Sequence, residues 1–148
     1  MEQKMEFGLD HNPDARGIRE EVFMKEQGFC NEFDSLDAKA WHVVIYEGGD
    51  PVATGRTFPK EGDSKIWMIG RVAVRRPYRG KNYGKAVIVA LEKKLRELGA
   101  SYAELSSQVQ ARGFYEKLGY TAYGEEYLDE HCPHIAMRKA VSHAETGM

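Results

Sequence analysis

One stretch of the chain, residues 66–98, combines a strand, a basic turn and a helix in direct succession. Residues 66–74 (IWMIGRVAV) are apolar at seven of nine positions with little alternation, which predicts a strand covered on both faces. Pro77 cannot continue a strand ladder, so the chain leaves the sheet there. The helix that we expect from Gly84 carries apolar residues at helical spacing, and Gly99 stands where a left-handed C-cap belongs.

The turn between this strand and this helix has the composition of an anion-binding site. Five cations fall within eleven residues, around Gly80 and Gly84. Because the first turn of a helix has unpaired N–H groups and a positive dipole end, amides and cations would converge on one ligand. We expect an anion of pyrophosphate size, and the alternative is a solvated basic helix start whose glycines serve geometry alone. The cations are Arg75, Arg76, Arg79, Lys81 and Lys85.

Two common phosphate-binding motifs do not match the turn. A nucleoside-triphosphate loop needs G-x-x-x-x-G-K-[ST], but only three residues separate Gly80 from Gly84. Ala86 also stands where the Mg²⁺-binding hydroxyl would be. The dinucleotide fingerprint G-x-G-x-x-G is absent as well. The turn therefore differs from both classes of nucleotide loop.

Residues 79–84 (RGKNYG) resemble the R/Q-x-x-G-x-G/A signature of the GCN5-related N-acetyltransferase (GNAT) superfamily, which follows a strand ending in Val-x-x-x-Pro. The middle glycine of the signature is Asn82 in this chain. Asn tolerates a positive φ better than most side chains, so the amides can still surround a phosphate. The resemblance implies that the ligand is the diphosphate of coenzyme A.

Two further segments resemble the same superfamily. Residues 110–120 (QARGFYEKLGY) are similar to its A-x-x-F-Y-x-x-x-G-F/Y segment, which packs along the pantetheine arm. Residues 18–27 (IREEVFMKEQ), followed by Glu32, Asp34 and Asp37, are similar to the R-x-x-V-F-x-x-E-Q pattern of its ElaA/YjcF-like branch. The motifs at residues 79–84 and 110–120 stand in the family's order and separation, and together they are more specific than either alone.

The resemblance implies an α/β GNAT fold in one domain spanning residues 1–148, with a frayed tail at 141–148. A single mixed sheet of six or seven strands would be splayed between the fourth and fifth strands, with helices on both faces. The fourth and fifth strands are expected to be parallel because a helix separates them. The patterns place strands at 6–9, 41–46, 52–58, 66–74, 102–107, 121–127 and 135–139, and helices at 13–27, 84–98 and 111–118.

Residues 28–40 are acidic and poorly periodic. We expect a lid or a short second helix over the acceptor site, and the alternative is a solvated acidic loop.

Composition argues against several classes of partner. The net charge of −2 argues against a nucleic-acid binder. No apolar run reaches membrane-spanning length and the first residues are no signal peptide, so we expect a cytoplasmic protein with no membrane partner. Cys30 and Cys132 lack metal-ligand spacing, which predicts two free thiols and no metal. Exposed sheet edges would allow a homodimer.

Acetyl transfer from a thioester to an amine needs a neutral amine, a stabilised oxyanion, a proton for the departing thiolate, and alignment of the two substrates. By the resemblance, Tyr115 is the general acid beside the sulfur, and the alternative is a tyrosine buried for packing. Amides near the end of the fourth strand would polarise the thioester carbonyl. The coenzyme-binding residues implied are Val72, Ala73, Val74, Arg79, Gly80, Lys81, Asn82, Tyr83, Gly84, Lys85 and Tyr115.

His134, in the Pro-His-Ile segment that opens the last strand, is the candidate general base. Histidine titrates near neutral pH, and the segment resembles relatives in which this histidine faces the acceptor. His42, at the start of the second strand, and Glu26 are the alternatives for this role.

Arg19 and Arg71 are the candidate cations on the acceptor side, where His42 and Glu26 would also contact the substrate. A charge in a central strand has to be paired or to face a cleft. If both arginines face the cleft, the acceptor carries a carboxylate or phosphate. The alternative is that they form structural ion pairs with Glu26, Asp34 or Asp37.

The predicted function is therefore an acetyl-CoA-dependent N-acetyltransferase. It would transfer the acetyl group to the primary amine of a small molecule, acidic if the two arginines face the cleft, by direct attack on the thioester. The alternative is a regulatory module that binds acyl-CoA and has little or no turnover.

Overall fold

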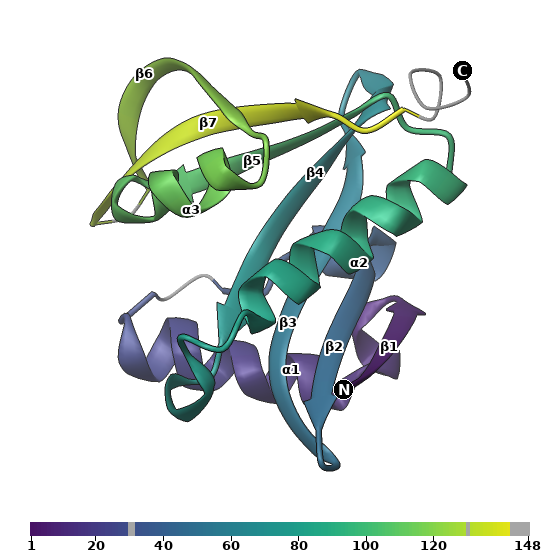
Figure 1. Cartoon of the computed structure of the whole chain (residues 1–148), viewed down its shortest axis with the longest axis vertical. Coiled ribbons are helices and arrows are strands. Elements are labelled where there is room, and N and C mark those ends of the chain that lie inside the picture. Colours follow the sequence, from purple (N-terminus) through teal and green to yellow (C-terminus); the bar gives the residue numbers. More distant parts are fainter. Residues whose placement is uncertain (30–31, 130, 143–148) are drawn as a thin grey trace. The chain divides into compact units, whose positions relative to one another are not determined.

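The computed structural model describes residues 1–29, 32–129 and 131–142 of the chain. Seven strands form one mixed sheet in the order β1-β2-β3-β4-β5-β7-β6 (Figure 1). Contacts divide the chain into two compact units. The first unit is Met1–Phe58 with Gly70–Leu91, and the second is Pro59–Ile69 with the described residues from Glu92 on.

The first unit is built on an antiparallel meander. Its strands are β1 (Glu2–Phe7), β2 (Trp41–Glu47) and β3 (Asp50–Lys60), with β4 (Asp63–Val74) next in the sheet. Gly48 and Gly49 have φ 59° and 87° between β2 and β3. Two consecutive positive φ values make a hairpin turn whose twist matches that of the strands, so the predicted hairpin is confirmed.

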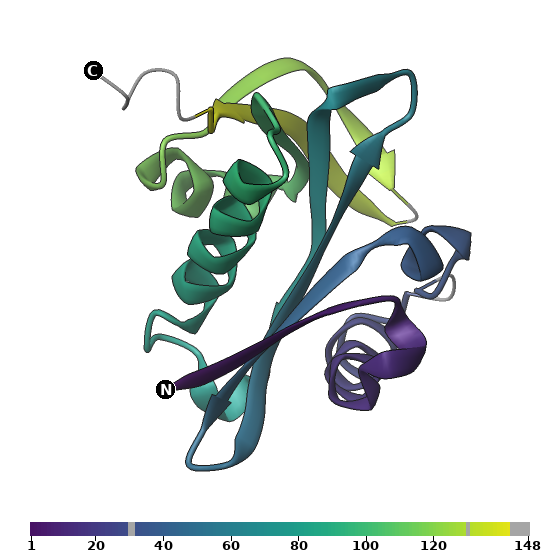
Figure 2. The ribbon, with the colours of Figure 1, turned by 90° about the vertical axis from the view of Figure 1, so that its right-hand side faces the viewer.

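Helices cover both faces of β2 and β3 in the first unit, as predicted (Figure 2). α1 (Pro13–Arg19) packs its buried face on the side of β2 that carries Val44. On the other side, a Cβ added at Gly55 of β3 would lie 2.5 Å from a Val87 methyl group of α2 (Tyr83–Glu97). The absence of a side chain at Gly55 therefore allows helix and strand to approach closely.

α1 starts as its sequence predicts and ends differently. The Asn12 side chain accepts a hydrogen bond from the Ala15 amide at 3.3 Å, and Pro13 occupies the first turn. The helix then continues as a π-helical segment, η2 (Glu20–Glu26), in which the amide of Gln27 donates to the Val22 carbonyl. π-helical turns are rare and are frequent at functional sites.

The second unit contains the other three strands and α3 (Arg112–Lys117), which follows the 3-10 turn η5 (Val109–Ala111). β7 (Cys132–Ala140) runs antiparallel to both β5 (Tyr102–Gln108) and β6 (Thr121–Asp129). β5 is parallel to β4, and this ladder ends at Ile69 and Leu105 although both strands continue. The predicted parallel pair and its splay are confirmed.

Three expectations about individual elements need correction. The first strand was expected at residues 6–9, but β1 ends at Phe7 because Gly8, with φ 86°, turns the chain into the 3-10 helix η1 (Leu9–His11). The expected short helix within 28–40 is only the 3-10 helix η3 (Ser35–Lys39), capped by Asp34. β4 is not covered throughout, since Trp67, Met68 and residues 70–72 are half-buried.

Among the described residues, no helix has both the length and the apolar character needed to cross a membrane. Cys132 is a free thiol, as predicted, and is half-buried at the start of β7. Cys30 and residues 143–148 of the expected tail lie outside the described residues.

Candidate active site

The glycine turn, which we define as residues 79–85, lies in the first unit between the end of β4 and the start of α2. Gly80 has φ 80° and Asn82 has φ 67°. Both values fall in the left-handed region, which glycine adopts freely and Asn adopts more readily than most side chains. Asn82 thus supplies the backbone geometry expected of a glycine at this position.

The backbone amides of the glycine turn are available to a ligand. Within the described part of the chain, no backbone carbonyl accepts from the amides of residues 80–82. The amide of Ala86 donates to the Asn82 carbonyl at 3.1 Å, and the amides before it belong to the unpaired first turn of α2. The Lys81 and Lys85 side chains are exposed on the same segment. Free amides, a helix N-terminus and two lysines together form an arrangement that suits an anion.

Arg79, the first residue of the glycine turn, is bound to protein groups. Its Nη1 and Nη2 donate to the two carboxylate oxygens of Glu26 at 2.6 and 2.8 Å, and its Nε donates to the Val74 carbonyl at 2.9 Å. Arg76 also pairs with Glu26 at 3.4 Å. The hydrogen bonds with Arg79 lower the pKa of Glu26, and the same bonds raise the pKa of Arg79. Glu26 is therefore ionised at neutral pH and paired with the turn.

β4 is irregular at Arg71, which has φ 52°. A non-glycine residue with positive φ within a strand is uncommon, and such conformations cluster at functional sites. Val72, Ala73 and Val74 follow directly and complete the strand. Their amides therefore lie in the part of β4 that comes after the end of its ladder with β5.

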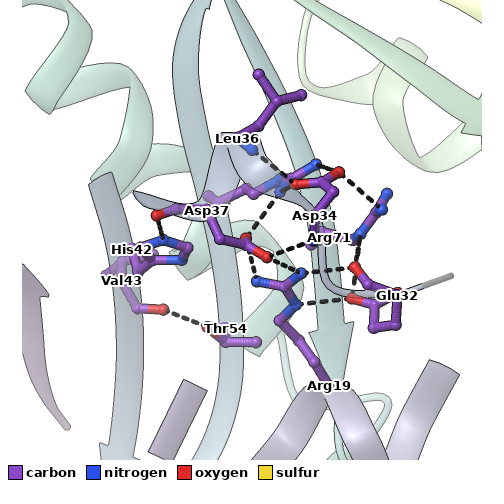
Figure 3. Close-up of polar contacts among 10 residues, drawn as sticks. Arg19, Glu32, Asp34, Leu36, Asp37, His42, Val43, Thr54 and Arg71 are labelled. Carbon is purple, nitrogen blue, oxygen red and sulfur yellow. Dashed lines mark hydrogen bonds and ion pairs between the residues drawn. The ribbon is translucent and has the colours of Figure 1, made fainter. Parts of the chain in front are cut away.

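Six charged side chains of the first unit form one ion-pair cluster on the α1 side of the sheet (Figure 3). The acids come from the segment around η3 and the arginines come from α1, β3 and β4. Three cations face three anions, so their formal charges balance. The members are Arg19, Glu32, Asp34, Asp37, Arg56 and Arg71.

Arg19 is 1% exposed at the centre of the cluster. Its Nε donates to the Glu32 carboxylate at 2.7 Å, and its Nη1 donates to the Asp37 carboxylate at 2.7 Å. Its Nη2 donates to the Glu32 carbonyl at 2.9 Å and to Asp37 at 3.2 Å. All three guanidinium nitrogens thus have acceptors, which favours the structural alternative for Arg19 over contact with an acceptor substrate.

Arg71 is bound less completely, and its side chain is 26% exposed. Its Nε donates to the Glu32 carbonyl at 3.1 Å, and its Nη2 donates to Asp34 at 3.4 Å. Burial and the nearby charge of Arg56 lower the pKa of Arg71. Of the two arginines expected on the acceptor side, Arg71 is the one with solvent access.

Two of the three acids of the cluster are withdrawn from solvent, whereas Asp34 is exposed. Glu32 and Asp37 are both 4% exposed, so the solvated-loop alternative is wrong for these two residues. Burial alone would raise the pKa of Asp37, but the hydrogen bonds and charges of Arg19 and Arg56 outweigh burial and lower it to about 2. At Glu32 burial is the larger effect and raises the pKa. The cluster thus fastens the 32–39 segment to the sheet.

His42 lies fully buried beside the cluster. Its Nε2 donates to the Asp37 carbonyl at 3.0 Å, so the neutral ring carries its lone pair on Nδ1, which has no partner among the described residues. Burial lowers the pKa of His42, which favours this neutral form. Direct contact with an acceptor would require a path to a side chain that has no exposed surface.

Tyr115 belongs to α3 in the second unit. Its ring makes edge contacts with Phe114, at a centroid distance of 4.9 Å, and with Tyr120, at 6.0 Å. Burial raises the pKa of Tyr115 to about 12. The hydroxyl therefore keeps its proton throughout the physiological range and can act as a donor.

His134 lies on β7 in the second unit. Its Nδ1 is 2.9 Å from the Cys132 carbonyl. Because a carbonyl can only accept, Nδ1 carries the proton in the neutral ring and Nε2 carries the lone pair. Tyr127 of β6 stacks on the imidazole, with centroids 6.1 Å apart and planes at 28°. The hydroxyl of Tyr127 also pairs with Ser106 of β5.

Each unit therefore holds part of the predicted site. The first unit contains the glycine turn, Glu26 and the cluster with Arg19, Arg71 and His42, and the second contains Tyr115 and His134. Sequence reasoning missed Arg56 and Tyr127. The signal for Arg56 was available, since an arginine within a strand that carries no other charge, VATGRTF, needs a partner. Tyr127 carried no signal, because its stacking depends on the register of β6 against β7.

The chain matches the model of the acetyltransferase (GNAT) family over residues 9–120. A curated relative, the N-acetyltransferase YjcF of Bacillus subtilis, is 40% identical over 129 residues, which cover 85% of this chain and 90% of the relative. This match agrees with the branch that residues 18–27 resemble.

Two solved structures share the fold. An acyl-CoA N-acyltransferase from Pseudomonas aeruginosa has a TM-score of 0.83 at 26% identity, covering 95% of this chain and 100% of its own. Escherichia coli ElaA has a TM-score of 0.82 at 23% identity, covering 93% and 98%. With a family model matching most of the chain and a relative at 40% identity, the chain is an acetyltransferase of the GNAT family.

Proposed function

We propose that this chain is an acetyl-CoA-dependent N-acetyltransferase that transfers the acetyl group to the primary amine of a small acceptor by direct attack on the thioester. The observation that carries the proposal is the glycine turn. There Gly80 and Asn82 both have positive φ and the amides of residues 80–82 have no backbone acceptor among the described residues, in a chain of the GNAT family.

The residues of the glycine turn fit a coenzyme diphosphate. The free amides and the start of α2 would bind its oxygens, and Lys81 and Lys85 would balance its charge. The Tyr83 hydroxyl already donates to Glu47 at 2.8 Å, so Tyr83 would contribute its amide rather than its side chain. Bound there, acetyl-CoA would supply the thioester on which the amine acts.

Three groups of the chain would carry the chemistry. Nε2 of His134 would accept the proton of the attacking amine, directly or through a water molecule. Amides among residues 72–74 would donate to the carbonyl oxygen as it becomes an oxyanion. The hydroxyl of Tyr115 would then protonate the departing thiolate. The products are an amide and free coenzyme A, and no covalent enzyme intermediate is needed.

The acceptor side of the proposal rests on Arg71. Arg19 is fully engaged by acids, whereas Arg71 has solvent access and an Nη1 without a partner among the described residues. A guanidinium in this state suits a carboxylate or phosphate on the acceptor. We therefore propose a small primary amine that also carries an acidic group.

A thiol-release assay tests the proposed function. Acetyl-CoA is incubated with the chain and a panel of amino acids, amino sugars, polyamines and peptides, and free thiol is measured. We expect release with at least one amino acid or other acidic amine. The variant Gly84→Asp, which places a carboxylate in the first turn of α2 beside the expected diphosphate, should lose both coenzyme binding and release. Coenzyme binding with no transfer to any amine would contradict the proposal and favour the regulatory alternative.

A further inference from the structure

Glu26 and Arg79 form the most complete ion pair in contact with the glycine turn. The carboxylate and the guanidinium meet through two parallel hydrogen bonds, at 2.6 and 2.8 Å. This bidentate arrangement fixes orientation as well as distance. The two residues are 53 positions apart in the sequence, so the pair joins the end of η2 to the start of the turn.

The guanidinium of Arg79 also binds the end of β4. Its Nε donates to the Val74 carbonyl at 2.9 Å. Three of the five N–H groups of the side chain are thus directed toward η2 and β4. A diphosphate that used Arg79 as its principal ligand would compete with Glu26 for the same edge of the guanidinium.

Fixing Arg79 in place limits the conformational freedom of the backbone that follows it. Gly80 and Asn82 adopt left-handed conformations, and a glycine has more conformational freedom to lose than any other residue. The residue before them is fixed at three atoms by Glu26 and Val74. The helical end that carries Glu26 is itself held, because the amide of Phe29 donates to the Phe23 carbonyl at 2.8 Å.

We propose that Glu26 is a positioning residue for the coenzyme: it acts through Arg79 to hold the glycine turn in its anion-binding conformation. The backbone amides of the turn then bind the diphosphate, and Arg79 serves as the connection between the turn, η2 and β4. This inference rests on the proposed function, since it assumes that coenzyme A binds the turn. It gives Glu26 a role on the coenzyme side, in place of the base or acceptor roles considered from the sequence.

The direction in which Glu26→Gln changes the affinity for coenzyme A distinguishes this inference from direct binding of the diphosphate by Arg79. Glu26→Gln removes a negative charge near the expected diphosphate. If Glu26 only competed with the phosphate, this variant would bind coenzyme A more tightly. If Glu26 positions the turn, the variant binds more weakly, by about fivefold for an ion pair of this exposure.

Glu21→Gln is the matched control. Glu21 lies on the same helical segment and pairs with Arg75 at 3.1 Å, outside the glycine turn. Its replacement removes the same charge from the same element and leaves the pair of Glu26 with Arg79 intact. We expect its coenzyme affinity to equal that of the wild type or to be slightly higher.

A double-mutant cycle completes the experiment, with the dissociation constant of coenzyme A measured by calorimetry. Glu26→Gln and Arg79→Gln should each weaken binding by about fivefold, and the double variant should bind no more weakly than either one. Thermal midpoints measured in parallel should stay close to one another, because the pair is partly exposed.

Two results would overturn the inference. One is a Glu26→Gln variant with unchanged or tighter coenzyme binding, and the other is additive losses in the double variant, which would make Arg79 a direct ligand. A wild-type chain that does not bind coenzyme A at all would instead remove the proposed function, so the two failures are distinguishable.

Discussion

At the scale of single residues, His134 is prepared for a base role by what surrounds it. The Cys132 carbonyl fixes the proton on Nδ1, and the stacked ring of Tyr127 limits rotation of the imidazole. Replacing His134 by Gln keeps a polar side chain but removes the lone pair of Nε2. We expect kcat for acetyl transfer to fall by roughly 10²-fold or more, with little change in the KM for acetyl-CoA. Unchanged kcat would mean that His134 is not the base.

The raised pKa of Tyr115 leads to a prediction about how activity depends on pH. Because its pKa is raised to about 12, the hydroxyl stays protonated at every pH at which the chain can be assayed. The pH–rate profile of the wild type should therefore show no loss of activity from deprotonation of this tyrosine up to about pH 10. Tyr115→Phe should lower kcat by roughly 10²-fold, while the affinity for coenzyme A stays within about twofold. Equal kcat values for the wild type and Tyr115→Phe would identify Tyr115 as a packing residue.

The site residues show what one sequence can and cannot reveal. The motif marked the glycine turn, and the tolerance of Asn for positive φ anticipated the geometry of Asn82. Whether Arg19 and Arg71 bind substrate or acids was left open, because it depends on side chains that arrive from a segment without periodicity. The acids of residues 32–37 surround Arg19 and leave Arg71 partly exposed, and no spacing rule gives that difference.

At the scale of elements, the ion-pair cluster fastens the 32–39 segment, and Asp37 is its most strongly perturbed member. Its pKa falls from 3.8 to about 2 on folding. A lowered pKa stabilises the folded state above the unfolded value, so the contribution is complete above about pH 4 and is lost as the pH falls through about 2. The shift corresponds to about 2 kcal/mol of the free energy of unfolding.

The substitution Asp37→Asn tests this contribution. The change leaves Arg19 and Arg56 without one of their buried partners, so the free energy of unfolding at pH 7 should fall by about 3 kcal/mol. Urea unfolding at pH 7 measures the loss. Asp10→Asn, at an exposed acid of η1, is the control and should change stability by less than about 0.5 kcal/mol. Equal stabilities of the substituted and wild-type chains would mean that the cluster does not hold the segment.

The contact of α2 with β3 gives a second prediction at this scale. A Cβ at Gly55 would lie 2.5 Å from Val87 and 3.1 Å from Leu91, both on the buried face of α2. Gly55→Ala should therefore lower the free energy of unfolding by about 1–3 kcal/mol. Gly17→Ala in α1, where a Cβ meets nothing within 4 Å, should leave stability unchanged or raise it by up to about 1 kcal/mol. Thermal unfolding of both variants checks the contrast.

The elements themselves were largely predictable, because their signals are local. Apolar periodicity, Pro13, Gly99 and Gly119 marked helix boundaries correctly to within a residue or two. The segment before β2 was not predictable in the same way. Its 3-10 helix is held by the capping interaction of Asp34 with Asp37 and by buried arginines distant in sequence. A pattern of local hydrophobicity carries no information about such partners.

At the scale of the whole molecule, the single mixed sheet and its splay followed from the family resemblance, and the parallel direction of β4 and β5 followed from the helix between them. The division of contacts into two units was not expected. The boundary between the units runs through β4 and α2, so each of these elements contributes residues to both units. The predicted single domain and the predicted homodimer therefore stay predictions. A single cooperative unfolding transition, followed by two spectroscopic probes, is the outcome expected of one domain.

The central claim is that the glycine turn binds the diphosphate of coenzyme A through its backbone. A crystal structure of the chain with bound coenzyme A tests it most directly. We predict diphosphate oxygens within hydrogen-bonding distance of the amides of residues 80–85, with Glu26 still paired to Arg79. A coenzyme bound elsewhere on the chain, with those amides facing solvent, would contradict the account.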